Sequence, residues 1–243
     1  MGLFYTRACK SRAACQGPQP FSFKNLVNKF NTSFATSKVS EDNLVVFVVG
    51  PTGAGKSWFI KELVNNDKVR VGKNGQHPCT TAVEAWMCHF EQGPDNIVIV
   101  DTPSFCTEVD GFDAEGIMSS WIKSRLSEKC CSSGIIYLHT LARNPTDPDM
   151  SIERHLNIFS STFPARCAVP SRVCVVPTLE RACKLGSDKV GERLSRLDTE
   201  THLLDGSKWS ASMFPDVFEG QSEIAWEVVQ KILEDMSVSS QVP

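Results

Sequence analysis

Residues 44–57 read LVVFVVGPTGAGKS, and this stretch decides the fold. Leu44–Val49 is a continuous apolar run rich in β-branched residues, which is typical of a strand covered on both faces. Gly50–Ser57 match the pattern G-x-x-x-x-G-K-S, and the apolar spacing of Trp58–Val64 predicts a helix immediately afterwards. A glycine-rich loop between a buried strand and a helix is the setting in which this pattern binds phosphate groups.

The chemistry of this loop follows from its residue types. Glycine lets the backbone bend until successive N–H groups point inward, and the helix that begins at Lys56 adds its positive N-terminal dipole. Lys56 supplies an ammonium for the β- and γ-phosphates, and Ser57 supplies a hydroxyl ligand for Mg²⁺. The alternative is a glycine-rich turn that precedes Lys-Ser by chance. The predicted nucleotide-binding residues of the loop are Gly50, Pro51, Thr52, Gly53, Ala54, Gly55, Lys56 and Ser57.

Two further segments are candidates for Mg²⁺ ligands. Asp101 follows the apolar run Asn96–Val100, and a carboxylate at the carboxyl end of a buried strand is where a P-loop NTPase holds Mg²⁺. Thr80 lies near the end of the polar stretch 65–82 and could place a second hydroxyl opposite Ser57. The alternatives are an aspartate that opens a turn and a threonine that opens the next strand.

Strand and helix patterns alternate along the rest of the chain. Strands are predicted at 83–90, 96–100, 134–139 and 172–176, and helices at 58–64, 113–126, 151–163, 188–204 and 222–234. This alternation predicts a three-layer α/β fold of the P-loop NTPase class, with a mostly parallel sheet flanked by helices. We expect one nucleotide-binding domain at 41–236, a basic and disordered leader at 1–40, and a flexible tail at 237–243.

The composition excludes several classes of protein. Twenty-five basic and 28 acidic residues give a net charge of −3, which argues against a dedicated nucleic-acid-binding protein. No apolar run approaches the roughly 20 residues of a membrane span. The ten cysteines form no C-x-x-C pair, so we expect reduced thiols in a cytoplasmic protein. The charge is uneven, because residues 1–40 hold six basic and no acidic residues while the remainder carries a net −9.

Several of these segments together resemble a known family. GPTGAGKS at 50–57, Cys79-Thr80, DTPSF at 101–105 and SGIIYLH at 133–139 are similar to the single-domain G proteins of mushroom-forming fungi, which are related to septin and GIMAP-type GTPases. The resemblance covers residues 44–235 and implies a Ras-like G domain that binds GTP or GDP with Mg²⁺. It makes Thr80 the switch threonine, Asp101–Ser104 the aspartate motif of the second switch, and Thr178 a remnant of the guanine-reading motif.

Three positions depart from the pattern that the resemblance implies. Ser104 stands where the aspartate motif normally ends in glycine, and a side chain there restricts the peptide that contacts the γ-phosphate. Phe105 stands where Ras-like enzymes often carry a glutamine that orients water, so hydrolysis is expected to be slow or partner-dependent. Pro177–Arg181 lack the guanine-reading aspartate; Glu180 either replaces it through another geometry or is a solvated residue at a helix start. We assign no catalytic residue.

The basic leader has three interpretations. Met1–Thr6 (MGLFYT) satisfies the minimal N-myristoylation pattern, and Cys9 and Cys15 are candidates for further acylation. One myristoyl chain binds membranes only marginally, so anchoring would need a second chain or the basic residues. The leader could instead be an organellar presequence or a solvated arm. The leader is therefore the only segment that is a candidate for membrane association.

Three functions are consistent with the sequence. The first is a Mg²⁺-dependent GTP-binding protein with low intrinsic hydrolysis, whose partners would be guanine nucleotide and either a second copy or an effector protein. The second is a P-loop ATP-binding protein, favoured by the missing aspartate after Thr178. The third is a pseudo-GTPase interaction module, favoured by Ser104 and by Pro177–Arg181. Competition between GTP and ATP for one site separates these functions.

Overall fold

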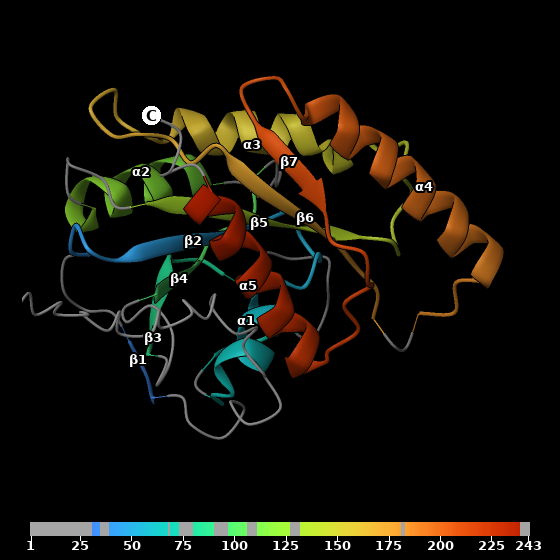
Figure 1. The fold of residues 1–243 in the computed structure, drawn as a ribbon, viewed down its shortest axis with the longest axis horizontal. Helices are drawn as coiled ribbons and strands as arrows, with labels where there is room; N and C mark the ends of the chain where they lie inside the picture. The colour runs from blue at the N-terminus through green and yellow to red at the C-terminus, as the bar shows by residue number, and fades with distance from the viewer. Residues whose placement is uncertain are drawn as a thin grey trace, which may run out of the picture.

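A seven-stranded sheet forms the centre of the molecule, with strand order β1-β3-β4-β2-β5-β6-β7 (Figure 1). The structure is a computed structural model that describes residues 31–34, 39–67, 69–72, 80–89, 97–105, 111–126, 132–180 and 183–238. The strands are β1 (Asn31–Phe34), β2 (Leu44–Val49), β3 (Glu84–His89), β4 (Ile97–Asp101), β5 (Ser133–Thr140), β6 (Arg172–Thr178) and β7 (Ser210–Met213). The helices are α1 (Lys56–Val64), α2 (Ala114–Arg125), α3 (Ile152–Ser161), α4 (Ser187–Leu204) and α5 (Ser222–Val238).

Strand β2 lies near the middle of the sheet, and its neighbours fix the position of the loop that follows it. It pairs in parallel with β4 and with β5, and β6 and β7 continue the parallel arrangement. Only β3 and β1 run antiparallel to their neighbours. Because the carboxyl ends of parallel strands share one edge, the loops after β2, β4, β5 and β6 meet there.

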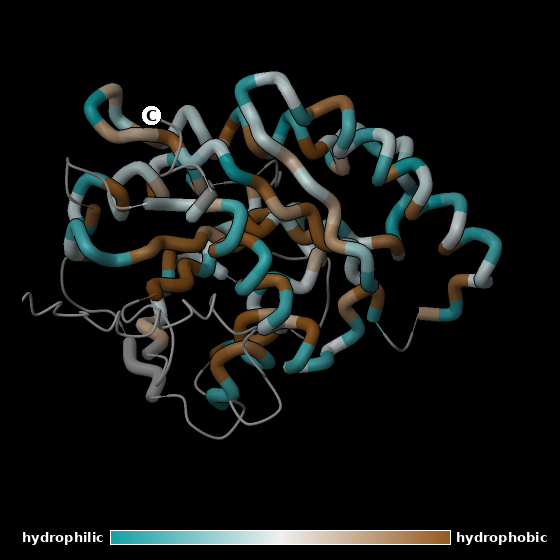
Figure 2. The backbone as a smooth tube through the Cα atoms, in the orientation of Figure 1, coloured by the Kyte–Doolittle hydropathy of each residue, from teal (hydrophilic) through white to brown (hydrophobic). Residues whose placement is uncertain are grey.

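Two apolar layers cover the sheet, one on each face. Alternate residues of β2 face opposite ways: Val45 and Phe47 pack with α2, α3 and α4, whereas Val46 and Val48 pack with α1 and α5. Figure 1 shows the helices in these two groups, and Figure 2 shows hydrophobic residues concentrated in the central strands. Burial on both faces explains why β2 reads as a continuous apolar run rather than an alternating one.

The predicted fold class is confirmed. Each strand and helix predicted from the sequence is present, with ends that differ by no more than four residues from those predicted. Strand β7 was not among the predictions, because its sequence SASM is short and has no apolar pattern. It joins the sheet through its pairing with β6.

The start of the domain needs a correction. The sequence placed Asn31–Phe34 in the leader at 1–40, but these residues form β1 and pair antiparallel with β3. The four-residue sequence NTSF carries no strand signal of its own, and its position depends on backbone pairing at the edge of the sheet. The sheet therefore includes four residues that the sequence assigned to the leader. Residues 1–30 and 239–243 lie outside the described part of the chain.

Candidate nucleotide-binding site

The loop Gly50–Gly55 turns sharply between β2 and α1. A Cβ atom on Gly50 would lie 2.3 Å from the carbonyl oxygen of Leu138 on β5, so only glycine allows this approach. Gly55 has φ 86° and occupies the position before α1, with no side-chain cap and no acidic residue in the first turn. The N-terminal N–H groups and dipole of α1 are thus aimed at the loop without a side-chain competitor, as an anion site requires.

The Lys56 ammonium is buried at the edge of this loop. Its Nζ donates hydrogen bonds to the Gly50 carbonyl (2.9 Å), the Pro51 carbonyl (3.2 Å) and the Ser104 Oγ (2.6 Å). Burial lowers the pKa of Lys56 to about 8, although the nearby Asp101 opposes this shift. The lysine therefore connects the loop after β2 to the segment after β4.

Three oxygen-bearing side chains from distant segments meet beside Lys56. The Ser57 hydroxyl donates to Asp101 Oδ2 at 2.8 Å, and Thr80 Oγ1 lies 2.9 Å from Ser57 Oγ and 3.4 Å from Asp101 Oδ2. Asp101 Oδ1 is buried and has no hydrogen-bond partner within the described residues. An unsatisfied carboxylate oxygen beside two hydroxyls is the hard-oxygen donor set that suits Mg²⁺. The three predicted Mg²⁺ ligands therefore lie together and fit this ion.

Asp101 carries an unusual pKa because of its surroundings. Burial raises the pKa of its carboxyl to about 6, while Lys56 and the hydrogen bond from Ser57 act in the opposite direction. A buried carboxylate of this kind is stabilised in its charged form by an additional cation. A cation bound at Asp101 would therefore lower this pKa again.

Ser104 and Phe105 follow Asp101 and close one side of the site. The Ser104 hydroxyl contacts the Lys56 ammonium, as described above. Phe105 is only 2% exposed, and its ring lies 6.1 Å from that of Phe159 on α3. Phe105 is thus fixed in the apolar layer under α3, and an apolar ring offers a water molecule no hydrogen bond.

Thr178 connects the end of β6 to the phosphate loop. Its hydroxyl donates to the Ala54 carbonyl at 2.9 Å, and it pairs with Phe218 in the loop after β7. The Leu179 N–H donates to the Phe218 carbonyl at 3.1 Å, which keeps the two loops side by side. Glu219 follows Phe218 directly, so a half-buried acidic residue lies at the same edge of the sheet as Thr178.

Sequence reasoning missed this part of the site. The Trp58 ring lies 5.0 Å from that of Phe218. A Cβ on Gly220 would come within 2.2 Å of Trp58, and Gly220 has φ 92°, so this loop and α1 are fitted closely together. Glu180, the acidic residue considered from the sequence, is exposed. The sequence could have indicated Glu219 only as a residue in the loop that follows β7. Because β7 itself was not predicted, this indication was missing.

A buried cluster of Tyr137 and two histidines lies beneath the site. The Tyr137 hydroxyl and the Ser151 carbonyl each lie 2.9 Å from His155 Nδ1. His139 Nδ1 and His155 Nε2 are buried and find no hydrogen-bond partner among the described residues. Burial lowers the pKa of His139 and of His155 to about 4, so both rings are neutral near pH 7.

These pKa shifts predict an acid-sensitive fold. The unfolded chain binds protons on both histidines below about pH 6.5, whereas the folded chain binds them only near pH 4. The free energy of unfolding should therefore be greatest above pH 6.5 and fall between pH 6.5 and 4, by on the order of 1 kcal/mol per pH unit for each histidine. Urea unfolding at a series of pH values measures this slope.

A variant isolates the histidine contribution. Asp101 titrates with the opposite sign, because its raised pKa makes the folded chain the stronger proton binder between about pH 4 and 6. The Asp101 contribution is the same in the wild-type chain and in His155→Asn. It therefore cancels when the pH dependence of the free energy of unfolding is compared between the two. An unchanged slope in the variant would show that His155 does not titrate as its burial requires.

Comparisons with known proteins agree with this geometry. Residues 45–161 match the family model described as 50S ribosome-binding GTPase. No curated protein in the comparison matches the chain. Among solved structures, a bacterial selenocysteine-specific elongation factor EF-Sec is similar at 16% identity and a TM-score of 0.52, over 79% of this chain and 29% of that one. Aquifex aeolicus Era bound to GDP and AlF4⁻ is similar at 14% identity and a TM-score of 0.52, over 79% of this chain and 56% of Era.

In a third similar structure, the matched region makes up a larger share of the known protein. A structure of the chloroplast translocon components atToc33 and psToc159 is similar at 16% identity and a TM-score of 0.51, over 83% of this chain and 85% of that one. The chain spans less than two thirds of EF-Sec and of Era. At these identities, 14–16%, the likeness concerns the fold alone. Together with the family match over residues 45–161, it shows that this chain contains a domain of the P-loop GTPase fold.

Proposed function

We propose that this protein binds GTP and GDP with Mg²⁺ and hydrolyses GTP slowly or only with a partner. The observation that carries the proposal is the meeting of Lys56 with the Ser57–Thr80–Asp101 group at the uncapped start of α1. A buried ammonium beside hydroxyl and carboxylate oxygens can hold a polyphosphate together with its metal ion.

Each residue of the site has a distinct part in this proposal. The N–H groups of the loop Gly50–Gly55 and of the first turn of α1 would hold the β-phosphate, and Lys56 would donate to the β- and γ-phosphates. Ser57, Thr80 and Asp101 would hold Mg²⁺, which neutralises part of the phosphate charge when bound. This assignment uses the Asp101 oxygen that has no partner among the described residues.

Selectivity for guanine is assigned to Glu219. Guanine presents N1–H and a 2-amino group on one edge, and a carboxylate accepts both hydrogen bonds, whereas adenine offers no matching pair of donors. Glu219 is half-buried and adjoins Phe218, which pairs with Thr178 beside the phosphate loop. Glu180, the acidic residue that lies just after β6, is exposed.

Competition for one site tests the proposed ligand. A fluorescent GTP analogue should bind in the presence of Mg²⁺ and be displaced by GTP and GDP at micromolar or lower concentrations, while ATP displaces it at least about tenfold less effectively. Stronger displacement by ATP would contradict the proposal and favour an ATP-binding protein. Binding that does not change when EDTA removes Mg²⁺ would contradict the assigned metal ligands.

Slow hydrolysis is supported by the position of Phe105. Its ring is buried against Phe159 and cannot orient a water molecule toward the γ-phosphate. The same observation favours a second candidate, a pseudo-GTPase that binds nucleotide without turnover. Single-turnover measurement of phosphate release separates the two, because any release that Lys56→Ala abolishes supports the GTPase.

A serine substitution tests how the lysine is held before nucleotide binds. In the wild-type chain, a phosphate oxygen has to displace the Ser104 hydroxyl, which accepts a hydrogen bond of 2.6 Å from the Lys56 ammonium. In Ser104→Ala this competing acceptor is absent. GTP affinity should rise by roughly two- to tenfold, the equivalent of one net hydrogen bond. Isothermal titration measures this change, with Ser161→Ala on the exposed side of α3 as a control. A loss of affinity in Ser104→Ala would instead show that its hydroxyl contacts the nucleotide.

Partners and location also remain proposals. A second copy of the chain or an effector protein is the proposed protein partner, and the proposed location is cytoplasmic. Within the described residues, no helix combines the length and the hydrophobicity that crossing a membrane requires. The N-myristoylation and presequence interpretations concern residues 1–30, outside the described part of the chain, and mass spectrometry of the N-terminus tests both.

A further inference from the structure

An open groove runs along α4 on the face opposite α1 and α5. It has a volume of about 360 Å³ and lies between α4 on one side and, on the other, the connection 145–151 together with the first residues of α3. This volume falls within the range of about 300–1,000 Å³ that is typical of ligand-binding pockets. The groove is separate from the Lys56 site, and none of the residues assigned to phosphate, Mg²⁺ or guanine lines it.

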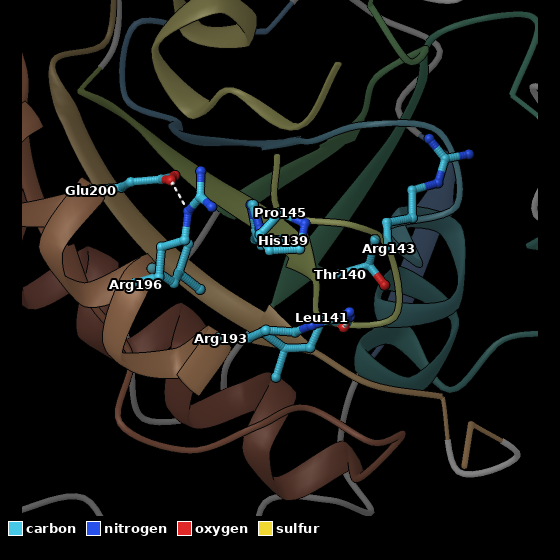
Figure 3. A pocket seen from close by; sticks show the side chains of 9 residues that line it. His139, Thr140, Leu141, Arg143, Pro145, Arg193, Arg196 and Glu200 are labelled. Atoms are coloured by element: carbon cyan, nitrogen blue, oxygen red, sulfur yellow. Dashed lines mark hydrogen bonds and ion pairs between the residues drawn. The ribbon is translucent and has the colours of Figure 1, made fainter. Parts of the chain in front are cut away.

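The end of the groove nearest β5 offers little further space. There it adjoins a smaller pocket of about 10 Å³, lined by His139 and Arg193, which has room for about one water molecule. Figure 3 shows Arg196 and Glu200 projecting from α4 at this end, joined by an ion pair of 3.0 Å. The usable space therefore lies toward the carboxyl end of α4, beyond this ion pair.

The groove combines apolar and acidic walls. Leu203 is 77% exposed, the largest exposed fraction among the large hydrophobic side chains of the described residues, and it lines the groove. Asp147, Glu153 and Glu200 also line it, against a single basic residue, Arg196. An occupant that suits these walls carries apolar side chains and positive charge, and no negative charge.

We propose that the groove docks the chain's own basic leader, residues 1–30. This segment contains five basic residues and no acidic residue, together with several large apolar side chains: Leu3, Phe4, Phe21, Phe23, Leu26, Val27 and Phe30. The domain of a second copy is a poorer occupant, because residues after position 40 carry a net −9 and would repel the acidic wall.

The leader is long enough to reach the groove. Residue 31 begins β1 at one edge of the sheet, and α4 packs against β6 and β7 at the other. Seven strands spaced by about 4.8 Å make the sheet roughly 29 Å wide. Thirty residues span at most about 100 Å when extended, so the leader can pass around the sheet and bring part of its length to the groove.

Zero-length carbodiimide cross-linking of the full chain tests this docking. The reagent joins lysine to carboxylate only when the two are in contact. In a mixture of unlabelled and ¹⁵N-labelled chains at low salt, we expect cross-links from Lys10, Lys24 or Lys29 to Asp147 or Glu200, each within one chain. Mass spectrometry identifies both the residues and the isotope pairing.

A matched pair of variants makes the test specific. In Glu153→Lys/Leu203→Lys, the acceptors Asp147 and Glu200 remain, yet cross-links to them should fall by about tenfold because an ionic and an apolar contact are lost. Glu223→Lys/Val169→Lys makes the same change of charge at exposed positions away from the groove, and its cross-links should match those of the wild-type chain. Thermal unfolding checks that both variants fold.

Three outcomes would overturn the proposal. Cross-links at the groove that join labelled to unlabelled chains would assign it to a second copy. Leader cross-links that are unchanged in Glu153→Lys/Leu203→Lys would show contact without docking in the groove. No cross-link between the leader and the groove in a folded chain would show that the leader does not dock there.

Discussion

A Lys56→Ala variant is expected to bind GTP at least about 100-fold more weakly than the wild-type chain. The ammonium is already buried and held by the Gly50 and Pro51 carbonyls and the Ser104 hydroxyl, so its contacts to phosphate need little further desolvation. Each charge-assisted hydrogen bond to phosphate contributes roughly 1.5–3 kcal/mol. The alanine variant loses the two proposed bonds from Lys56, one to the β-phosphate and one to the γ-phosphate. Titration with a fluorescent GTP analogue measures the affinity.

The chain offers a control for this variant on the same helix. Lys61 lies near the end of α1, and its side chain is 38% exposed in an ion pair with the fully exposed Asp67. Lys61→Ala removes the same charge from the same helix without a contact to the loop, so GTP affinity should change by less than about twofold. If Lys56→Ala bound GTP as tightly as Lys61→Ala, nucleotide would not bind at this loop.

The phosphate side of the site could be predicted because its signals are local. A buried strand, eight loop residues and a helix start are contiguous in Leu44–Val64, and each has its own sequence pattern. Asp101 was predictable because it ends a buried apolar strand, and parallel strands place such ends at one edge. That three-dimensional rule, rather than proximity in sequence, brings Asp101 within 2.8 Å of Ser57.

The base side could not be predicted because it depends on non-local pairing. Glu219, the proposed guanine-reading residue, lies at this edge because Phe218 pairs with Thr178, and that pairing extends from β7, whose sequence gives no strand signal. The Tyr137–His155 contact was hidden for a similar reason, since it joins β5 to α3 across the apolar layer. Strand β1 was missed because four residues of an edge strand carry too little pattern to separate them from a leader.

A Glu219→Gln variant is expected to lose GTP affinity by roughly 10- to 100-fold, with little change in ATP affinity. The carboxylate would accept two hydrogen bonds from guanine, whereas glutamine keeps one acceptor and turns an amino group toward the 2-amino group of the base. Xanthine carries a carbonyl oxygen in place of the 2-amino group. This oxygen can accept a hydrogen bond from the glutamine amide. The variant should therefore prefer XTP to GTP, and competition against a fluorescent nucleotide measures both affinities.

The reversal of preference makes this prediction specific to a contact with the base. A variant that only disturbed the loop between β7 and α5 would weaken GTP and XTP together, because both nucleotides share the phosphates held by Lys56. Glu180→Gln is the matched control, since Glu180 lies just after β6 and is exposed. If Glu180→Gln rather than Glu219→Gln switched the preference to XTP, guanine would be read from the end of β6. If neither did, the selectivity of the site would not depend on a carboxylate at this edge.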